Sequence, residues 1–327
     1  MVDPHVRADL RRLRASMARV ILGKDEVIDL VLTGLLARGH VLLRDVPGVG
    51  KTMLARALAR SIGGTFARVQ CTPDLLPSDI LGTVVIDPRT FEARFVPGPI
   101  FAHVVLVDEL NRTSPRTQAA FLEPMDEGQV TVDGQARLLP QPFFLIATLN
   151  PAEHHGTYPL PEGQLDRFTL AASVGYPPPD AERAMLAGHA GRHPIEDVSP
   201  VLTPAEVVRL REAAAAVHVS PAVHDYVVRL VAATRTDPAV ALGASPRASL
   251  ALLRAAQGCA LLQGRGYVTP DDVKALAVPV LAHRLVVRAA SAGVTDGPGT
   301  GHAAEAVVWR AVAQTEVPVF DAHHVDT

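Results

Sequence analysis

A short glycine-rich run followed by lysine and threonine, near position 50, is typical of a loop that binds phosphate. The run is Val46-Pro47-Gly48-Val49-Gly50-Lys51-Thr52, with Asp45 before it and Met53 after it. Small residues let backbone N–H groups curl around an anion, while Lys51 can reach the β- and γ-phosphates and the Thr52 hydroxyl can hold Mg²⁺. Residues 45–53 therefore predict a site for a nucleoside triphosphate.

One position of this loop departs from the general pattern G-x-x-x-x-G-K-[ST], because Asp45 stands where the first glycine is expected. Aspartate tolerates unusual backbone angles better than most residues, so the turn can still form. The alternative interpretation is a glycine-rich strand-to-helix turn that binds nothing. An apolar run at 41–43 and a helix-forming run at 53–59 flank the loop, and this context favours phosphate binding.

Two adjacent carboxylates follow the apolar run at 104–107, namely Asp108 and Glu109. A parallel sheet presents its ligands at the carboxyl ends of its strands. Asp108 is therefore predicted to help hold Mg²⁺, and Glu109 to take a proton from the attacking water or to orient it. A buried strand with polar residues at its exit is the alternative, which the phosphate loop upstream makes less favoured.

Three more residues suit phosphoryl transfer. Asn150 ends the apolar run at 143–149 and can bond the γ-phosphate or orient water, although Asn150-Pro151 equally suits an ordinary turn. Arg167 is a candidate arginine finger, because a planar, permanent cation suits the spread charge of a transferring phosphoryl group. Arg247 follows the helix-capping pair at 245–246 and could close onto the phosphates. Surface arginines are the alternative for both.

The elements that must position these residues alternate along the first half of the chain. Helical patterns at 6–20 and 25–36 precede apolar strand-like runs at 41–43, 65–70, 104–107 and 143–148. Strands separated by helices predict a parallel α/β sheet covered on both faces. Two hairpins interrupt it, at 83–96 and at 129–138, the second around the turn Asp133-Gly134.

The pattern changes at the proline run 176–179, after which the chain is expected to be helical. Serine or threonine followed by proline recurs as a helix start at 203, 220, 245 and 269. The prediction is two domains, 1–177 and 178–327. The second contains helices to about residue 290, a glycine-rich loop at 291–301, a last helix at 303–313 and a disordered tail at 320–327.

Composition limits the class of protein. The chain has 327 residues, of which 48% are hydrophobic, and a net charge of −3, which argues against a strongly basic nucleic-acid surface. We expect a cytoplasmic protein without membrane insertion, since it has no long apolar run and its two cysteines form no CxxC. The pairs His154-His155 and His323-His324 are not expected to bind metal, because adjacent side chains point apart.

Taken together and in order, these motifs resemble those of an AAA+ ATPase, and more closely those of the MoxR family. The resemblance covers about residues 15–290. The matching segments are 45–52, 108–112, 147–151, 158–168 and 243–247. In this family an aspartate at the position of Asp45 is familiar. Leu110 and Gly163 stand where isoleucine and alanine are more usual, which are mild departures.

The resemblance implies a fold and a role for each motif. The fold is a three-layer P-loop domain with a five-stranded parallel sheet, followed by a small all-helical lid, with ATP between them. Asp108 and Glu109 correspond to the Walker B pair, Asn150 to sensor 1 and Arg247 to sensor 2. Arg167 corresponds to the finger offered to a neighbouring subunit, with Arg112 and Arg116 as rivals. The segment Ile21-Leu22-Gly23 corresponds to the one that packs near adenine.

The resemblance also implies partners. A finger supplied by a neighbour means an oligomer, expected to be a hexameric ring whose pore is lined by the two hairpins. The expected function is a chaperone that remodels or matures a client protein, with metal or cofactor insertion as one outcome. A protein with a von Willebrand factor A domain is the expected partner, and the client is unidentified. The alternatives are a nucleic-acid-associated motor and a nucleotide-regulated scaffold.

Overall fold

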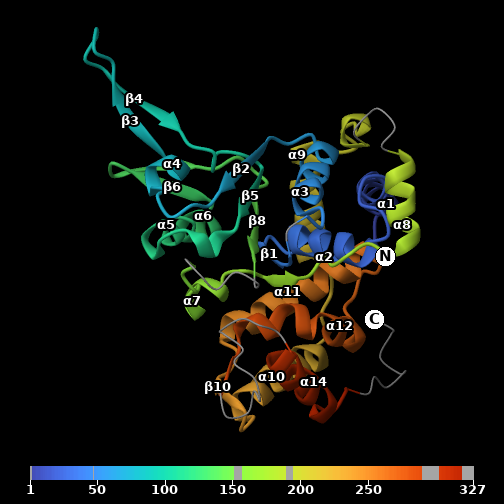
Figure 1. The fold of residues 1–327 in the computed structure, drawn as a ribbon. Coiled ribbons are helices and arrows are strands. Elements are labelled where there is room, and N and C mark those ends of the chain that lie inside the picture. The colour runs from blue at the N-terminus through green and yellow to red at the C-terminus, as the bar shows by residue number, and fades with distance from the viewer. Residues whose placement is uncertain (1, 47, 151–156, 189–193, 289–301, 319–327) are drawn as a thin grey trace.

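The centre of the molecule is a five-stranded parallel sheet with the strand order β2-β5-β8-β1-β9. The computed structural model describes residues 2–46, 48–150, 157–188, 194–288 and 302–318. Figure 1 shows the sheet in the upper half of the molecule and most of the C-terminal helices below it. The strands are β1 (Val41–Arg44), β2 (Phe66–Gln70), β5 (Val104–Asp108), β8 (Phe144–Leu149) and β9 (Leu170–Ala172).

The central strands form because they are apolar on both faces. The side chains of β5 are buried from Val104 to Val107, and those of β8 from Phe144 to Thr148. Continuous apolar runs of this kind suit a parallel sheet covered by helices on both sides. The predicted α/β class is therefore confirmed, and the register places the carboxyl ends of β2 and β5 side by side, with Gln70 opposite Asp108.

The fifth strand, β9, was not among the runs that the residues themselves predicted. It has only three residues, Leu170-Ala171-Ala172, and alanine has a low strand propensity. Its strand conformation comes from pairing with β1, where Leu170 lies opposite Val41. Tertiary pairing therefore decides a segment whose local pattern is too short to predict a strand.

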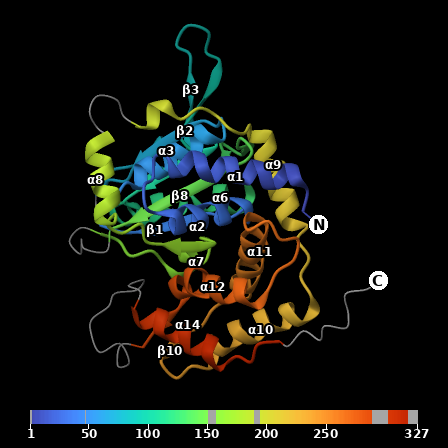
Figure 2. The same ribbon diagram turned by 90° about the vertical axis from the view of Figure 1, so that its right-hand side faces the viewer.

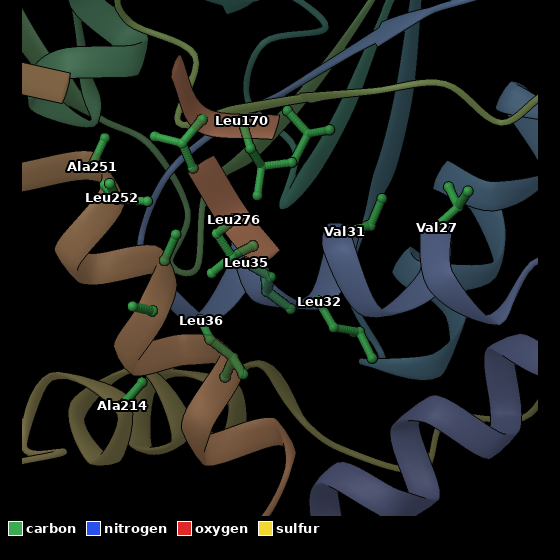
Figure 3. Close-up of a cluster of buried hydrophobic side chains, with 14 of the residues drawn as sticks. Val27, Val31, Leu32, Leu35, Leu36, Leu170, Ala214, Ala251, Leu252 and Leu276 are labelled. Atoms are coloured by element: carbon green, nitrogen blue, oxygen red, sulfur yellow. The ribbon is translucent and has the colours of Figure 1, made fainter. Parts of the chain in front are cut away.

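A single buried cluster joins the sheet to the helices that follow it. Helix α2 (Asp25–Leu36) contributes side chains along most of its length, and α9 (Pro204–Ala215) and α11 (Pro246–Leu262) pack against it. Figure 3 shows this packing, in which Leu170 of β9, Ala214 of α9 and Leu252 of α11 lie around the end of α2 that carries Leu35 and Leu36. The core is therefore continuous across the predicted domain boundary at 177/178, which stays a prediction.

Helix α1 (Pro4–Ala18) packs on α2 and on α3 (Lys51–Ser61), so three helices share one side of the sheet. Figure 2 shows α1, α2 and α3 together, with α9 close by. The other side carries short helices in the insert region. They are α4 (Pro77–Leu81), the 3-10 turn η1 (Leu110–Arg112), α5 (Pro115–Ala119), α6 (Leu122–Glu127) and α7 (Glu162–Leu165).

Both predicted hairpins are present. Strands β3 (Gly82–Ile86) and β4 (Ala93–Pro97) form the first, and β6 (Gln129–Val132) and β7 (Gln135–Leu138) form the second around Asp133-Gly134. The first hairpin projects away from the body in both views (Figures 1 and 2). Its Phe91 is 82% exposed, so this large apolar side chain buries little surface within the chain.

The helical character of the C-terminal region is confirmed, as are its predicted helix starts. Thr203, Ser220, Ser245 and Thr269 each accept a hydrogen bond from a backbone N–H in the first turn of a helix that begins with proline. Besides α9 and α11, the region contains α8 (Pro179–Gly188), the 3-10 turn η2 (Pro194–Asp197), α10 (Pro221–Thr236), α12 (Pro270–Leu281), the 3-10 turn η3 (Ala282–Arg284) and α14 (His302–Gln314).

One feature of this region was not predicted. Strands β10 (Val240–Leu242) and β11 (Val286–Val287) pair in an antiparallel ladder between helices. Both are too short to show a strand period in the sequence. The predicted loop at 291–301, the tail at 320–327 and both histidine pairs lie outside the described residues.

Candidate nucleotide site

A cavity of about 370 Å³ lies at the carboxyl ends of β2, β5 and β8, beside the first turn of α3. This volume is within the usual range of small-ligand sites. The residues predicted from the sequence that line it are Gly48, Gly50, Lys51, Thr52, Met53, Asp108, Glu109 and Asn150. The structure thus brings residues from three separate predicted motifs to one place.

The loop before α3 has the backbone geometry of an anion cradle. Gly48 and Gly50 have φ angles of 87° and 93°, a region that favours glycine. A Cβ atom added at either position would meet nothing within 4 Å, so the space beside the backbone is open. Gly50 caps α3 without a side-chain hydrogen bond, which leaves the N–H groups of the first turn available to an anion.

Lys51 belongs to the same loop. Its Nζ donates to the carbonyl oxygens of Asp45 at 2.9 Å and Val46 at 3.0 Å. Burial lowers the pKa of Lys51, and the negative charges of Asp45, Asp108 and Glu109 oppose this shift. The carbonyl oxygens of the loop therefore hold the Lys51 ammonium near the N-terminus of α3.

Asp108 is held by two neighbouring strands. Its Oδ1 accepts a hydrogen bond from Thr148 Oγ1 of β8 at 2.7 Å, and its Oδ2 lies 2.6 Å from Arg68 Nη2 of β2. Asp108 and Thr52 line the same cavity. Oxygen ligands of this kind, completed by water and phosphate, are those that Mg²⁺ prefers. The residues present therefore fit a Mg²⁺–nucleotide.

Glu109 has a left-handed backbone conformation, with φ 58° and ψ 48°, which is uncommon outside glycine and costs on the order of 1–2 kcal/mol. Its N–H donates to Thr148 Oγ1 at 2.8 Å. Its Oε2 accepts from Gln70 Nε2 at 3.1 Å and from Arg112 Nη1 at 2.9 Å. The chain therefore turns sharply after β5 and fixes this carboxylate at the edge of the cavity.

Asn150 follows β8 directly, is 5% exposed and lines the same cavity. Its place beside Asp108 and Glu109 follows from the order of the strands, because β5 and β8 are neighbours. Among the described residues, no cluster of three or more His, Cys, Asp or Glu side chains could hold a different metal.

Asp45 is not among the residues that line the cavity. Its carboxylate accepts hydrogen bonds from Ser173 Oγ at 3.1 Å, from Gly175 N at 3.2 Å and from Val174 N. The side chain is 7% exposed. The position that lacks the expected glycine therefore ties the end of β1 to the segment after β9, and Asp45 contributes to the site through its backbone carbonyl.

The segment 21–23 is also not brought to the cavity. Ile21 is buried in the main core, and Gly23 packs so closely that an added Cβ would lie 2.9 Å from Ala181 Cβ. Lys24 Nζ donates to the carbonyl of Tyr176 at 2.6 Å. These residues hold the start of α8 against the N-terminal segment. Of the predicted loop, Pro47 lies outside the described residues.

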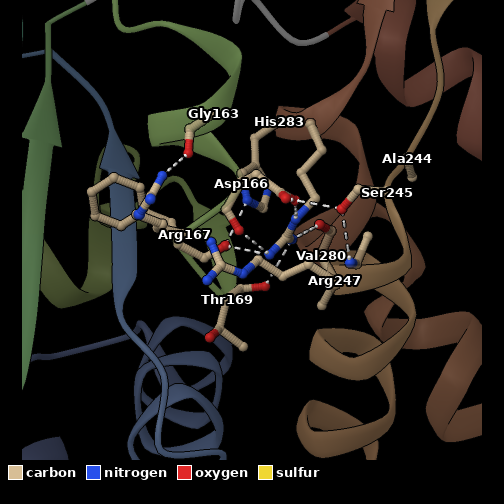
Figure 4. A network of polar contacts seen from close by, with 12 residues as sticks. Gly163, Asp166, Arg167, Thr169, Ala244, Ser245, Arg247, Val280 and His283 are labelled. Atoms are coloured by element: carbon tan, nitrogen blue, oxygen red, sulfur yellow. Dashed lines mark hydrogen bonds and ion pairs between the residues drawn. The ribbon is translucent and has the colours of Figure 1, made fainter. Parts of the chain in front are cut away.

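Arg167 and Arg247 do not line the cavity either, because both bind Asp126 at the end of α6. Arg167 Nε lies 2.7 Å from Asp126 Oδ2, and Arg247 Nη2 lies 2.9 Å from Asp126 Oδ1. The expectation that Arg247 reaches the phosphate cavity is therefore not met in this structure. Figure 4 shows Arg167 and Arg247 close to Asp166, whose carboxylate forms a second ion pair with Arg284.

The rival finger residues occupy different settings. Arg112 pairs with Glu109 at 2.9 Å, so it is engaged within its own chain. Arg116 is exposed on α5. None of these contacts selects one arginine as the finger.

Three residues that line the cavity were not predicted as functional, namely Arg68, Gln70 and Thr148. A signal for the first two exists in the sequence. They are two polar side chains at alternate positions near the end of β2, and alternation places them on one face of the strand. The sequence does not single out Asp126, which binds Arg167 and Arg247, because it is one of several acidic residues in the short helix α6.

The fold and the cavity define a P-loop ATPase of the AAA type with a helical lid. Residues 40–170 match the ATPase family associated with various cellular activities (AAA), and residues 232–298 match the AAA lid domain. A crystal structure of a Cytophaga hutchinsonii protein assigned as an ATPase has a TM-score of 0.86 with this chain, with 30% sequence identity, and each chain is 96% covered. None of the described helices is long and apolar enough to cross a membrane.

Two curated relatives narrow this class. The chain is 44% identical to Chaperone MoxR1 of Mycobacterium tuberculosis, covering 85% of this chain and 76% of the relative. It is 35% identical to Protein MoxR of Paracoccus denitrificans, covering 86% and 89%. A third relative is the uncharacterized protein YeaC of Bacillus subtilis, with 48% identity over 92% of each chain. The chain belongs to the MoxR family of AAA+ ATPases.

Proposed function

We propose that this protein binds ATP with Mg²⁺ and hydrolyses it to ADP and phosphate. The observation that carries the proposal is the cavity that joins the loop at 48–53 to Asp108, Glu109 and Asn150. Membership of an ATPase family gives independent support. A scaffold that only binds the Mg²⁺–nucleotide can use Asp108 but has no need of a base such as Glu109 beside it.

Each residue has a role in this proposal. The N–H groups of the loop and Lys51 hold the phosphates, and Thr52 and Asp108 hold Mg²⁺, which supplies charge stabilisation at the phosphates. Glu109 accepts a proton from water, whose oxygen forms a bond to the γ-phosphorus while the bond to the β–γ bridging oxygen breaks. Asn150 orients that water. Asp45, Val46, Pro47 and Val49 shape the loop, and segment 21–23 borders the adenine side.

We further propose that hydrolysis is completed in a homo-oligomer, with a hexameric ring as the working hypothesis. Arg167 lies outside its own cavity, which suits a finger that a subunit offers to its neighbour. The proposed output is chaperone work in the cytoplasm on a client protein, together with a partner that contains a von Willebrand factor A domain. Metal or cofactor insertion into the client is one form of that work. The name of the relative Chaperone MoxR1 supports the chaperone role, while the partner and the insertion step rest on the family resemblance alone.

The test measures phosphate release and ATP retention with Mg²⁺ over a range of protein concentrations. We expect Glu109→Gln to bind ATP but to release phosphate at least about a hundredfold more slowly, because general-base catalysis contributes roughly 10²–10⁴-fold. Glu182→Gln changes an exposed carboxylate on α8 and is the matched control, with an unchanged rate. An undiminished rate in Glu109→Gln, or a rate per subunit that stays flat down to dilutions containing only monomer, contradicts the respective proposal.

A further inference from the structure

Arg68 is a cation inside the nucleotide cavity to which no role has been given. It lies on β2 and lines the same cavity as Lys51 and Thr52. Its Nη2 is 2.6 Å from Asp108 Oδ2 and 2.6 Å from Gln70 Oε1. Since Thr148 Oγ1 bonds Asp108 Oδ1 at 2.7 Å, protein donors engage both carboxylate oxygens of Asp108.

We propose that Arg68 and Mg²⁺ compete for Asp108, so that Arg68 is a positioning residue that sets the Mg²⁺ requirement of the site. The inference rests on the proposed function, because it concerns the same Mg²⁺–nucleotide site. A guanidinium at 2.6 Å occupies the direction from which Oδ2 can receive a metal or a metal-bound water. A divalent cation placed beside it also meets the repulsion of a like charge.

A nucleotide phosphate bound in the same cavity would offer Arg68 an alternative anionic partner. The side chain of Arg68 is 47% exposed and that of Asp108 is 15% exposed, so the arginine end of the pair is open to solvent and free to turn. Ion pairs open to solvent change an equilibrium by a factor of roughly two to five. A guanidinium binds phosphate oxygens as readily as carboxylate. When Mg²⁺ takes Asp108, Arg68 therefore exchanges the carboxylate for a nucleotide phosphate.

This exchange predicts that Arg68→Gln strengthens the binding of Mg²⁺ and weakens the binding of nucleotide without Mg²⁺. The half-saturating Mg²⁺ concentration for nucleotide binding falls by roughly two- to fivefold, because the competitor for Asp108 is gone. The affinity for nucleotide in the presence of EDTA falls, because a cation that can bind phosphate is gone. General damage to the cavity would weaken the binding of Mg²⁺ and of nucleotide alike. Stronger Mg²⁺ binding together with weaker nucleotide binding is therefore specific to the exchange.

The experiment titrates the full-length protein with a fluorescent ATP analogue that cannot be hydrolysed, in EDTA and at stepped Mg²⁺ concentrations. Arg254→Gln changes an exposed arginine on α11 and is the control for net charge, with both quantities unchanged. Combining Arg68→Gln with Asp108→Asn tests the route: the effect of Arg68 on the Mg²⁺ requirement is expected to vanish when Asp108 has no charge. Arg68→Met, which keeps the aliphatic stem, replaces Arg68→Gln if that variant fails to fold.

The outcomes separate this inference from the proposed function. A wild-type protein that binds no nucleotide with or without Mg²⁺ overturns both. Nucleotide binding with an unchanged or higher half-saturating Mg²⁺ concentration in the Arg68 variant overturns the inference and leaves the proposed function standing. An effect that persists in the Asp108→Asn background also overturns it, because the competition must act through that carboxylate.

Discussion

The ion pair between Arg284 and Asp166 allows a sharp prediction about how the lid is held to the sheet domain. Arg284, in η3, is 5% exposed, and its Nε lies 2.8 Å from Asp166 Oδ1. It also donates to the carbonyl oxygens of Phe168 at 2.7 Å and Thr169 at 3.1 Å. Figure 4 shows Asp166 and Thr169, near the end of α7, facing Ser245, Val280 and His283 of the C-terminal region. Asp166 therefore neutralises a cation that is buried between two parts of the chain.

The perturbation is Asp166→Asn, which keeps the shape of the side chain and removes its charge. Burial lowers the pKa of Arg284 to about 10, and Asp166 opposes that shift. Breaking a buried pair from one side costs roughly 3–5 kcal/mol because a charge is left without its partner. Here Arg284 keeps its carbonyl partners, and Asp166 is 21% exposed, so we expect a loss of about 2–3 kcal/mol in the free energy of unfolding.

The matched control is Asp29→Asn. Asp29 pairs with Arg14 at 2.6 Å, but both side chains are well exposed, at 40% and 38%. Exposed pairs contribute about 0–1 kcal/mol. Urea unfolding followed by circular dichroism gives the free energy for the wild type and both variants under the same conditions. If Asp166→Asn loses no more stability than Asp29→Asn, burial does not govern this contact and the reasoning is wrong.

Two further predictions concern buried or shared charges. Burial lowers the pKa of His40 to about 4, below the unfolded value of about 6.5. The contribution of neutral His40 to the free energy of unfolding is therefore complete above pH 6.5. It is lost as the pH falls towards 4, by up to about 1.4 kcal/mol per pH unit. Urea unfolding at pH 7.5 and 5.5 checks this, and a His40→Gln variant with an equally steep loss contradicts it. Asp126→Asn releases Arg167 and Arg247 from their shared carboxylate and is expected to raise ATP affinity roughly two- to fivefold, measured with the same fluorescent analogue. An unchanged ATP affinity in Asp126→Asn would show that Arg247 does not act on the phosphates even when Asp126 no longer holds it.

The positions of Asp108, Glu109 and Asn150 were predictable because two rules combine. Long apolar runs identify buried parallel strands, and parallel strands end at one edge of the sheet. Polar residues that follow such runs must then lie near one another, whatever the loops between them do. The helix starts at Ser245 and Thr269 were predictable for a different local reason, since a capping hydroxyl followed by proline acts within one turn.

The partners of these residues could not be predicted, because they depend on how elements distant in sequence pack. The contact between Arg247 and Asp126 joins the first turn of α11 to the end of α6, which lie 121 positions apart. Its geometry follows from the packing of α11 against α2 and not from any local pattern. Asp45 shows the same limit: its sequence position indicated a loop residue, while its carboxylate accepts hydrogen bonds from the Ser173 hydroxyl and the Gly175 N–H after β9.

The cations to which a role at phosphate has been given, apart from Arg116, already have partners in this structure. Arg68, Arg112, Arg167 and Arg247 each contact a carboxylate, and Lys51 contacts two carbonyl oxygens. Nucleotide binding must therefore exchange partners and cannot simply add attractive contacts. The arginine side chains of these pairs are partly exposed, so each exchange costs less than breaking a fully buried pair. The preformed backbone cradle at 48–52 is the part of the site that needs no exchange, and it should account for most of the affinity. In the roles proposed above, the arginines would make the response depend on Mg²⁺ and on assembly.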